Sequence, residues 1–272
     1  MKKFLAAALV FIIAAGMLTG GIHIIHALTF DRITEYVEVN FYSRRLPVYL
    51  EGYRIAFIAD THEIRSDKLW EVVDRLNTMD IDLLLLGGDI NANRMTARRI
   101  ISVLSNIEAP DGVFGVEGNH DSPADLFTIM EEYGMTLLIN SGAHVRDGLF
   151  VGGVADSHQG RSSDIAKAIT DAGADDFVIL LSHRPDVAMQ QDTAGTDLIL
   201  AGHTHGGQMT FFGLWAPYFA INNSITDYGQ RFRSGWAYSR DGVPVFVTNG
   251  VGQYFPRVFA RPQVVVFTLR SY

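Results

Sequence analysis

Short apolar runs that end in polar side chains recur along this chain, and they constrain its fold more than any other feature. The run "YRIAFIAD" ends at Asp60, and "IDLLLLGGD" ends at Asp89. A segment with helical spacing of apolar residues, "SDKLWEVVDRLNTM" from Ser66, separates the two runs. Buried strands that alternate with helices predict an α/β core, and open α/β sheets place their sites at the carboxyl ends of the strands.

The alternation continues to the end of the chain. Further helices are predicted over residues 95–107, 122–134 and 162–173. Further strands are predicted over residues 112–121, 135–140, 148–156, 176–183, 197–203, 208–213, 244–250 and 263–269. Residues 213–235 are aromatic and irregular, which predicts a long surface loop. Two packed sheets flanked by helices accommodate this order.

The first thirty residues are mostly apolar and contain few charged residues. Lys2 and Lys3 are followed by no charged residue until Asp31, and the apolar run from Phe4 to Ile25 is long enough to cross a membrane. This favours a retained signal anchor over residues 1–28 above a cleaved signal peptide, which stays an alternative. A connector over residues 29–50, with an edge strand in "YVEVNFYS", then leads to a catalytic domain over residues 51–272.

The lysines before the span predict a cytoplasmic N-terminus and a single-pass protein of the cell membrane whose catalytic domain is extracytoplasmic. Arg32, Arg44 and Arg45 lie beyond the span and weaken that orientation.

Hydrophobic residues make up 48% of the 272 residues, which predicts a globular chain. The net charge of −8 argues against binding to a nucleic acid backbone, and the lack of cysteine excludes disulfides and thiolate sites.

The polar residues at the predicted strand ends are of the types that bind metal ions. They are Asp60, His62, Asp89, Asn119, His120, Asp121, His183, His203 and His205. One such histidine is more often a hydrogen-bonded residue near a core, but five separate strand ends that each supply ligand groups predict a metal centre. Carboxylates, an amide and imidazoles without a thiolate favour Mn²⁺, Fe or Zn²⁺. The ligands outnumber those of one tetrahedral ion, so two divalent ions are the natural alternative.

The ordered pattern D-x-H, G-D, G-N-H-D, H and G-H-x-H resembles that of the calcineurin-like metallophosphoesterases, a superfamily of binuclear phosphoester hydrolases. The resemblance covers about residues 50–272. "EGYRIAFIADTH", "GHTHGGQ" and "NGVGQYFPRVFARPQVVVFTL" are also similar to a membrane-associated bacterial branch that includes UDP-2,3-diacylglucosamine pyrophosphatase-like proteins. The implied fold is α/β, a four-layer α-β-β-α sandwich of two mixed sheets with flanking helices, here preceded by an N-terminal hydrophobic helix.

The resemblance also implies roles for individual residues. Asp60, His62 and His205 would bind one metal ion, and Asn119, His183 and His203 the other. Asp89 would bridge the two ions, and His120 would stabilise charge or donate a proton at the leaving group. Many relatives carry a second acid three residues after the bridging aspartate to orient this histidine, but Ala92 stands there in this chain. Asn91 or Asp121 could replace that acid; otherwise His120 is held less firmly.

Arginines are candidates for binding the phosphate oxygens, since a guanidinium matches them geometrically. Arg257 and Arg261 lie in the family-like tail, and Arg184 directly follows a ligand histidine. For each, the alternative is a structural or solvated arginine.

The sequence therefore predicts a binuclear, metal-dependent hydrolase of phosphoester or pyrophosphate bonds, in which metal-activated hydroxide attacks phosphorus. The expected substrate is a phosphorylated small molecule or a lipid-linked one, with the membrane as partner and no nucleic acid. Two alternatives stay open, a noncatalytic metal-binding envelope protein and a lipid-nucleotide pyrophosphatase. A single-metal amidase is disfavoured because the chain has no H-E-x-x-H motif.

Overall fold

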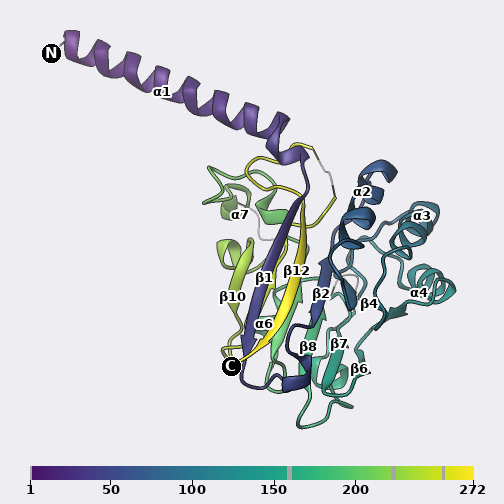
Figure 1. Ribbon diagram of the computed structural model, residues 1–272. Coiled ribbons are helices and arrows are strands. Elements are labelled where there is room, and N and C mark those ends of the chain that lie inside the picture. Colours follow the sequence, from purple (N-terminus) through teal and green to yellow (C-terminus); the bar gives the residue numbers. More distant parts are fainter. Residues whose placement is uncertain (1, 158–160, 222–224, 253–254) are drawn as a thin grey trace.

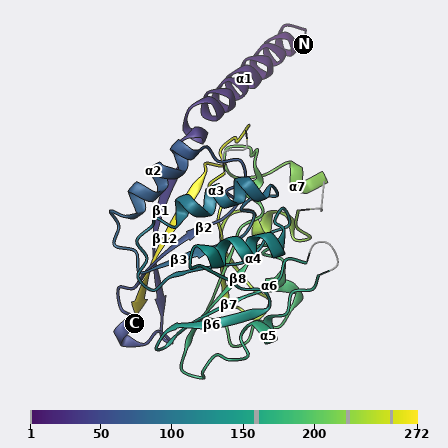
Figure 2. The ribbon, with the colours of Figure 1, turned by 90° about the vertical axis from the view of Figure 1, so that its right-hand side faces the viewer.

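Two six-stranded mixed sheets pack face to face, and helices cover the outer faces (Figures 1 and 2). The computed structural model describes residues 2–157, 161–221, 225–252 and 255–272. The first sheet has the order β1 (Glu35–Ser43), β12 (Gln263–Ser271), β2 (Arg54–Ile58), β3 (Leu83–Leu86), β4 (Val113–Gly115) and β5 (Thr136–Leu137). The second has the order β10 (Gly235–Tyr238), β11 (Pro244–Val247), β9 (Leu198–Ala201), β8 (Phe177–Ser182), β7 (Leu149–Gly153) and β6 (Ser141–Arg146).

Parallel pairing in the middle of each sheet brings the carboxyl ends of the strands to a common edge. In the first sheet, β2, β3, β4 and β5 pair in parallel, while β12 runs antiparallel to β2 and parallel to β1. In the second, β7, β8, β9 and β11 pair in parallel, with antiparallel β6 and β10 at the two edges. The connector segment thus contributes the predicted edge strand, β1.

Alternation of side chains along each strand builds separate cores on the two faces of each sheet. On β2, Ile55 and Phe57 belong to the core between the sheets, whereas Ala56 and Ile58 belong to the core under the helices. The helices on this first sheet are α2 (Ser66–Leu76), α3 (Arg94–Leu104) and α4 (Pro123–Glu132). They bury their apolar faces, which explains why these strands read as continuous apolar runs.

The second sheet has a thinner outer layer. Leu180 and Ile199 pack in a smaller core with Ile165, Ala168 and residues of α6. The helices here are α5 (Ile165–Ala168) and α6 (Val187–Gln190), with α7 (Tyr218–Ile221) further along the chain. The predicted fold class, two mixed sheets with flanking helices, is confirmed.

Three local predictions differ from the structure. The strand predicted over residues 208–213 is wrong: the segment has only isolated bridges at Met209 and Phe211, because left-handed backbone at Gln208 and Phe212 interrupts an extended conformation. The helix predicted over residues 162–173 is reduced to the four residues of α5. The predicted loop over residues 213–235, of which 222–224 lie outside the described residues, contains α7 and a 3-10 turn, Gly229–Phe232.

The N-terminal segment forms one helix, α1 (Lys2–Leu28), which projects from the sandwich in Figure 1. By length and composition it is the kind of helix that can cross a membrane. Its apolar side chains are exposed along most of its length, as they would not be in the core helix of a globular protein. Within the described part of the chain, α1 contacts other segments through its last turns, at His23 and His26.

Candidate metal centre

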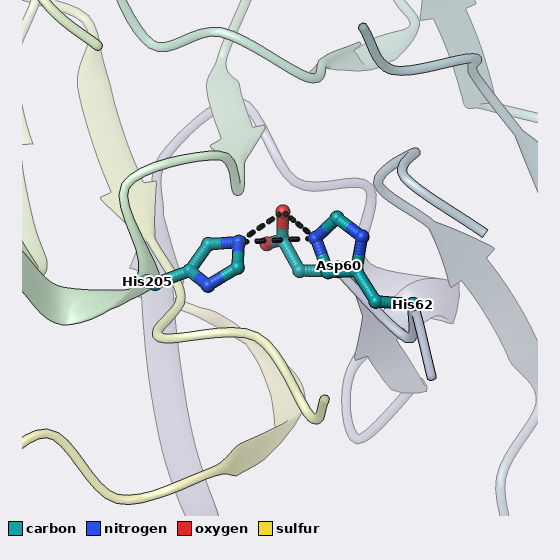
Figure 3. Close-up of side chains that lie close together, drawn as sticks. All are labelled: Asp60, His62 and His205. Atoms are coloured by element: carbon teal, nitrogen blue, oxygen red, sulfur yellow. Dashed lines mark hydrogen bonds and ion pairs between the residues drawn. The ribbon is translucent and has the colours of Figure 1, made fainter. Parts of the chain in front are cut away.

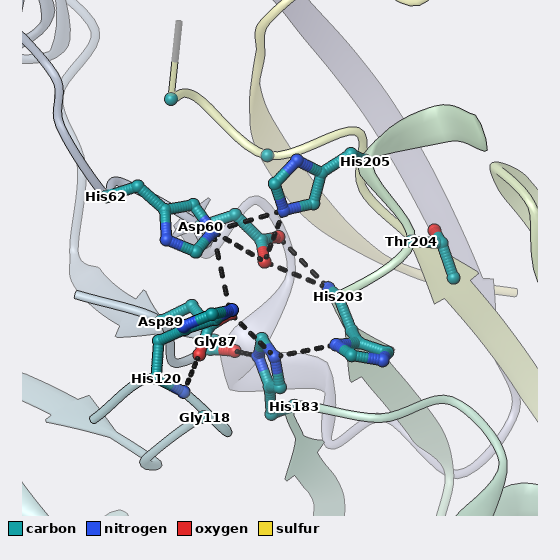
Figure 4. Close-up of polar contacts among 12 residues, drawn as sticks. Asp60, His62, Gly87, Asp89, Gly118, His120, His183, His203, Thr204 and His205 are labelled. Atoms are coloured by element: carbon teal, nitrogen blue, oxygen red, sulfur yellow. Dashed lines mark hydrogen bonds and ion pairs between the residues drawn. The ribbon is translucent and has the colours of Figure 1, made fainter. Parts of the chain in front are cut away.

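Ligand-type side chains from both sheets meet where the carboxyl ends of the parallel strands converge. The first sheet supplies residues after β2, β3 and β4, and the second supplies residues after β8 and β9 (Figure 4). The residues brought together are Asp60, His62, Asp89, Asn119, His120, His183, His203 and His205. The prediction that distant segments converge on one pocket therefore agrees with the structure.

The first cluster contains Asp60, His62 and His205 (Figure 3). The Nε2 atoms of the two histidines lie 3.1 Å apart, and Nε2 of His205 lies 3.4 Å from Oδ1 of Asp60. The backbone N–H of His203 donates to both carboxylate oxygens of Asp60, at 3.1 and 3.0 Å, which fixes the carboxylate plane. The three side chains thus aim their ligand atoms at a common point.

The second cluster contains Asp89, His183 and His203, with Asn119 beside them. Nε2 of His183 lies 3.3 Å from Oδ2 of Asp89, 3.2 Å from Oδ1 of Asn119 and 3.1 Å from Nδ1 of His203. Oδ2 of Asp89 also lies 3.5 Å from Nε2 of His62 in the first cluster. Asp89 therefore stands between the two clusters, where a bridging ligand would be.

The donor geometry fits divalent cations. Two ligand atoms about 2.1 Å from one ion, at angles of 90–110°, are separated by about 3.0–3.4 Å. The separations of 3.1 Å in the two clusters fall in this range.

Backbone groups orient the histidines. Nδ1 of His183 donates to the carbonyl of Gly87 at 2.9 Å, which leaves Nε2 as the ligand atom. Nε2 of His203 faces the carbonyl of Ile225 at 3.0 Å and Nη1 of Arg184 at 2.8 Å, whereas Nδ1 faces the second cluster and is the nitrogen placed to bind an ion. Such partners of the second ring nitrogen fix the tautomer in metal sites. Neither carbonyl had a signal in the sequence.

Backbone strain concentrates at the same residues. Asp60, His62, Asp89, His203 and His205 all have positive φ, between 43° and 72°. A non-glycine residue in this region costs on the order of 1–3 kcal/mol and persists where the surroundings hold it in place. Five such residues in one pocket indicate that the surrounding structure holds these side chains in place at a cost in folding stability.

Glycines that precede predicted ligands leave room for the carboxylates of Asp60 and Asp89. A Cβ atom at Gly118 would lie 2.2 Å from Oδ1 of Asp89, and one at Gly202 would lie 2.5 Å from Oδ2 of Asp60. Both distances are far below a van der Waals contact, so a larger residue would displace a ligand carboxylate.

Burial and mutual charge shift the protonation of the ligands. Burial raises the pKa of Asp60 and Asp89, but the nearby histidines outweigh burial and hold both carboxyls below their ordinary range. Burial lowers the pKa of His62 to about 4 and that of His203 well below its usual value. Burial also disfavours charged His183, yet Asp89 outweighs it and raises the pKa of His183 to about 10.

His120 lines the pocket, and its ring packs edge-on against His62 without a hydrogen bond to any of the described residues. Its backbone N–H donates to Oδ1 of Asp89 at 2.8 Å, and its ring centroid lies 5.3 Å from that of His62. Asp121 accepts from the backbone N–H groups of Gly118 and Asn91, and the Asn91 amide donates to the carbonyl of His62. Neither of the two proposed substitutes for the missing acid therefore orients the ring.

The arginines divide into structural residues and one pocket residue. Arg257 is 2% exposed and donates to the carbonyls of Gly252, Asn249 and Ala260. Burial lowers its pKa to about 10. Arg261 lies outside the pocket lining, with Nη1 3.7 Å from Glu35. The contacts of both are those of structural arginines, so the structure does not place them as phosphate ligands.

Arg184 lies on the pocket wall instead. Its Nε donates to Oδ2 of Asp156 at 3.0 Å, and its Nη1 lies 2.8 Å from Nε2 of His203. Its position directly after His183 was the one signal for this in the sequence. The same pocket, with a volume of about 720 Å³, is also lined by apolar residues that sequence reasoning missed, among them Met209 and Phe255.

Comparison with known proteins agrees with this centre. A sequence profile described as calcineurin-like phosphoesterase matches residues 53–207. The "Uncharacterized metallophosphoesterase YkuE" of Bacillus subtilis is 28% identical, with 95% of this chain and 94% of that protein covered. An "Uncharacterized metallophosphoesterase" of Helicobacter pylori is 25% identical over 82% of this chain, and a "Transmembrane protein with metallophosphoesterase domain" of Danio rerio is 27% identical over 86%. The chain spans only 62% and 57% of the length of these last two relatives.

Proposed function

The chain belongs to the calcineurin-like phosphoesterase family and is a phosphoric ester hydrolase, and we propose that it cleaves phosphodiester or pyrophosphate bonds with two divalent cations. We also propose that α1 anchors it in the cell membrane. The observation that carries the binuclear part is the place of Asp89. Its Oδ2 lies 3.5 Å from the histidine of one cluster and 3.3 Å from that of the other, as a shared ligand requires.

Each residue has a role in this proposal. Asp60, His62 and His205 would hold one ion, Asn119, His183 and His203 would hold the other, and Asp89 would contribute to both. When bound, the ions supply positive charge for the phosphate oxygens and lower the pKa of water. The nitrogen and oxygen donor set favours Mn²⁺, Fe or Zn²⁺.

Two pocket residues act on the substrate itself. His120 faces the pocket beside His62 and would donate a proton to the leaving oxygen, as a general acid. Arg184, held by Asp156, would bind a phosphate oxygen from the pocket wall. The pocket contains no serine among its described lining residues, and the chain has no cysteine, so a covalent phosphoenzyme is not part of the proposal.

A noncatalytic metal-binding protein would keep the same metal donors, and the position of His120 in the pocket is what disfavours this alternative. A UDP-2,3-diacylglucosamine pyrophosphatase-like activity stays a narrower form of the same proposal, supported only by the motifs that carry that resemblance. Lys2 and Lys3 favour an extracytoplasmic domain, which would separate the enzyme from cytoplasmic nucleotide-lipids. That orientation therefore argues against this narrower activity.

The test uses the full chain in detergent, stripped of metal and reloaded with Mn²⁺, Fe²⁺ or Zn²⁺. We expect hydrolysis of bis-p-nitrophenyl phosphate, about two ions per chain, and no cleavage of peptide or carboxylic ester substrates. Asp89→Asn should lower activity by at least about 100-fold and reduce the metal content. Asp147→Asn, at an exposed site far along the chain from any ligand, is the matched control. Full activity of Asp89→Asn would disprove the shared-ligand assignment.

A further inference from the structure

An apolar groove extends from the metal-ligand pocket to the end of α1. The groove has a volume of about 490 Å³ and shares the lining residues Met209, Phe255 and Pro256 with the ligand pocket. The two spaces therefore meet at these three side chains. A molecule bound at the ligands would reach the groove past these side chains.

The membrane-type helix forms one wall of this groove. His23, Ile24, Ala27 and Leu28, all in the last two turns of α1, line it. The facing wall includes Phe211, Pro217 and Val258. Apart from His23 and Thr210, the described lining is apolar, so the groove suits a hydrocarbon chain and not a sugar or a nucleotide.

Specific contacts hold α1 in this position. Nδ1 of His26 lies 2.7 Å from Oδ2 of buried Asp31, and this carboxylate also accepts the backbone N–H groups of Phe259 and Ala260. The ring of His26 stacks on Phe259, with centroids 3.8 Å apart. The ring of His23 packs edge-on against Phe259, at 5.0 Å. The helix end is thus built into the catalytic domain.

The groove lies at the depth of the lipid head groups if α1 spans the bilayer. About 20 helical residues cross the hydrocarbon core, so a span that starts at Phe4 ends near His23. The groove residues of α1 begin at that point. Exposed apolar side chains gather around it, including Phe211, Leu214, Trp215 and Phe255, as at a membrane interface.

We propose that the substrate is a membrane lipid with a phosphate in its head group, and that one acyl chain lies in this groove against α1 while the phosphate reaches the metal ligands. The helix is then a wall of the substrate site as well as an anchor. This inference rests on the proposed phosphoesterase function. In the reaction, one water oxygen bonds to phosphorus and the P–O bond to the leaving group breaks. One proton goes to the leaving oxygen and the other to solvent.

Two adjacent isoleucines of α1 provide a matched test. Ile24 lines the groove and Ile25 does not, yet they are 62% and 60% exposed. Ile24→Trp would fill the groove, whereas Ile25→Trp adds the same bulk outside it. The full chain is placed in dioleoylphosphatidylcholine nanodiscs that contain phosphatidylglycerol or CDP-dioleoylglycerol. Hydrolysis of these lipids is compared with that of water-soluble bis-p-nitrophenyl phosphate.

We expect the ratio of lipid to soluble activity to fall about tenfold or more in Ile24→Trp and to change less than about twofold in Ile25→Trp. Equal ratios in the two variants, or soluble activity without turnover of either lipid, would overturn the inference. Loss of soluble activity in the wild type would instead count against the proposed function. Leu28→Trp fills the same groove and replaces Ile24→Trp if that variant does not fold.

A second measurement needs no turnover. The metal-free wild-type chain is irradiated with a phosphatidylglycerol that carries a diazirine in its acyl chain. Crosslinks are expected on peptides that contain Met209 or Leu28, and they should decrease in Ile24→Trp but not in Ile25→Trp. Crosslinks confined to earlier turns of α1 would show that the groove holds no acyl chain. A peptide segment or a second copy as the occupant would give the same negative result.

Discussion

Nε2 of His183 lies 3.3 Å from Oδ2 of Asp89, and this pair determines how protons compete with metal in the second cluster. The carboxylate outweighs burial and raises the pKa of His183 to about 10, so the metal-free chain carries a proton there at pH 7 to 8. A histidine must be neutral to bind a metal ion. We therefore expect about one proton to be released when this cluster is filled. Calorimetry in buffers of different ionisation enthalpy measures it, and a binding enthalpy independent of buffer would contradict it.

The two clusters should lose metal at different pH values. Burial lowers the pKa of His62 to about 4, so this ligand of the first cluster stays neutral until strongly acid pH. His183 has its pKa raised above the working range, so protons compete for the second cluster as soon as the pH falls below about 10. Metal analysis after dialysis from pH 8 to pH 4 should show one ion lost well before the other. Simultaneous loss of both, or constant metal content down to pH 4, would disagree with this assignment.

Gly118→Ala should displace the carboxylate of Asp89 although the substituted residue is not itself a proposed ligand. Its Cβ would lie 2.2 Å from Oδ1 of Asp89, so the carboxylate has to move. We expect activity to fall by about tenfold or more, together with the metal content. Gly21→Ala, where a Cβ meets nothing within 4 Å, is the control. Metal binding equal to that of the wild type would mean that the carboxylate adapts.

Loss of the Arg257 side chain should lower the stability of the fold, whereas loss of the Arg184 side chain should lower catalytic activity. Arg257→Met leaves several buried carbonyls without a donor, so we expect unfolding to become easier by about 3 kcal/mol. Arg184→Met should instead lower kcat/KM by about tenfold or more, with a smaller change in the melting temperature. Thermal unfolding and steady-state kinetics of both variants separate the two roles. A stable Arg257→Met with raised KM would restore the phosphate-binding prediction for this residue.

His120→Asn should lower kcat by about 100-fold and leave the metal content unchanged, because His120 faces the pocket and lies outside both ligand clusters. The effect should be larger for an alkyl leaving group, which needs a proton, than for p-nitrophenolate, which does not. An equal loss for both leaving groups would exclude a general acid at this position.

The orientation of α1 is testable because the chain has no cysteine. Asp147→Cys places one thiol at an exposed position of the domain. With an extracytoplasmic domain, this thiol reacts with a membrane-impermeant maleimide in intact cells. Labelling only after lysis would place the domain in the cytoplasm.

Much of the centre was predictable from the sequence because the donors directly follow apolar runs. Runs such as "YRIAFIAD" are buried on both faces, so each had to be a central strand, and parallel strands end at one edge of a sheet. The identity of the donors then limited the chemistry to hard or borderline metal ions. These inferences need only local pattern and the general geometry of sheets.

The failures have a common cause in contacts between distant segments. Residues 208–213 read as a strand, but their backbone turns at Gln208 and Phe212 and pairs with Val258. Arg257 was predicted to be a phosphate ligand, but its guanidinium donates to the carbonyls of Asn249, Gly252 and Ala260. A local sequence pattern does not show which distant residues surround a side chain in the folded protein.

The alternation of elements, the candidate metal ligands and the apolar N-terminal helix were all predictable from the order of residues along the chain. The position of Asp89 between two clusters, the place of Arg184 on the pocket wall and the groove beside the end of α1 were known only once the chain was folded. The reason is physical: composition and periodicity depend on neighbours along the chain. A site depends on angstrom distances between side chains that lie on different strands, loops and helices.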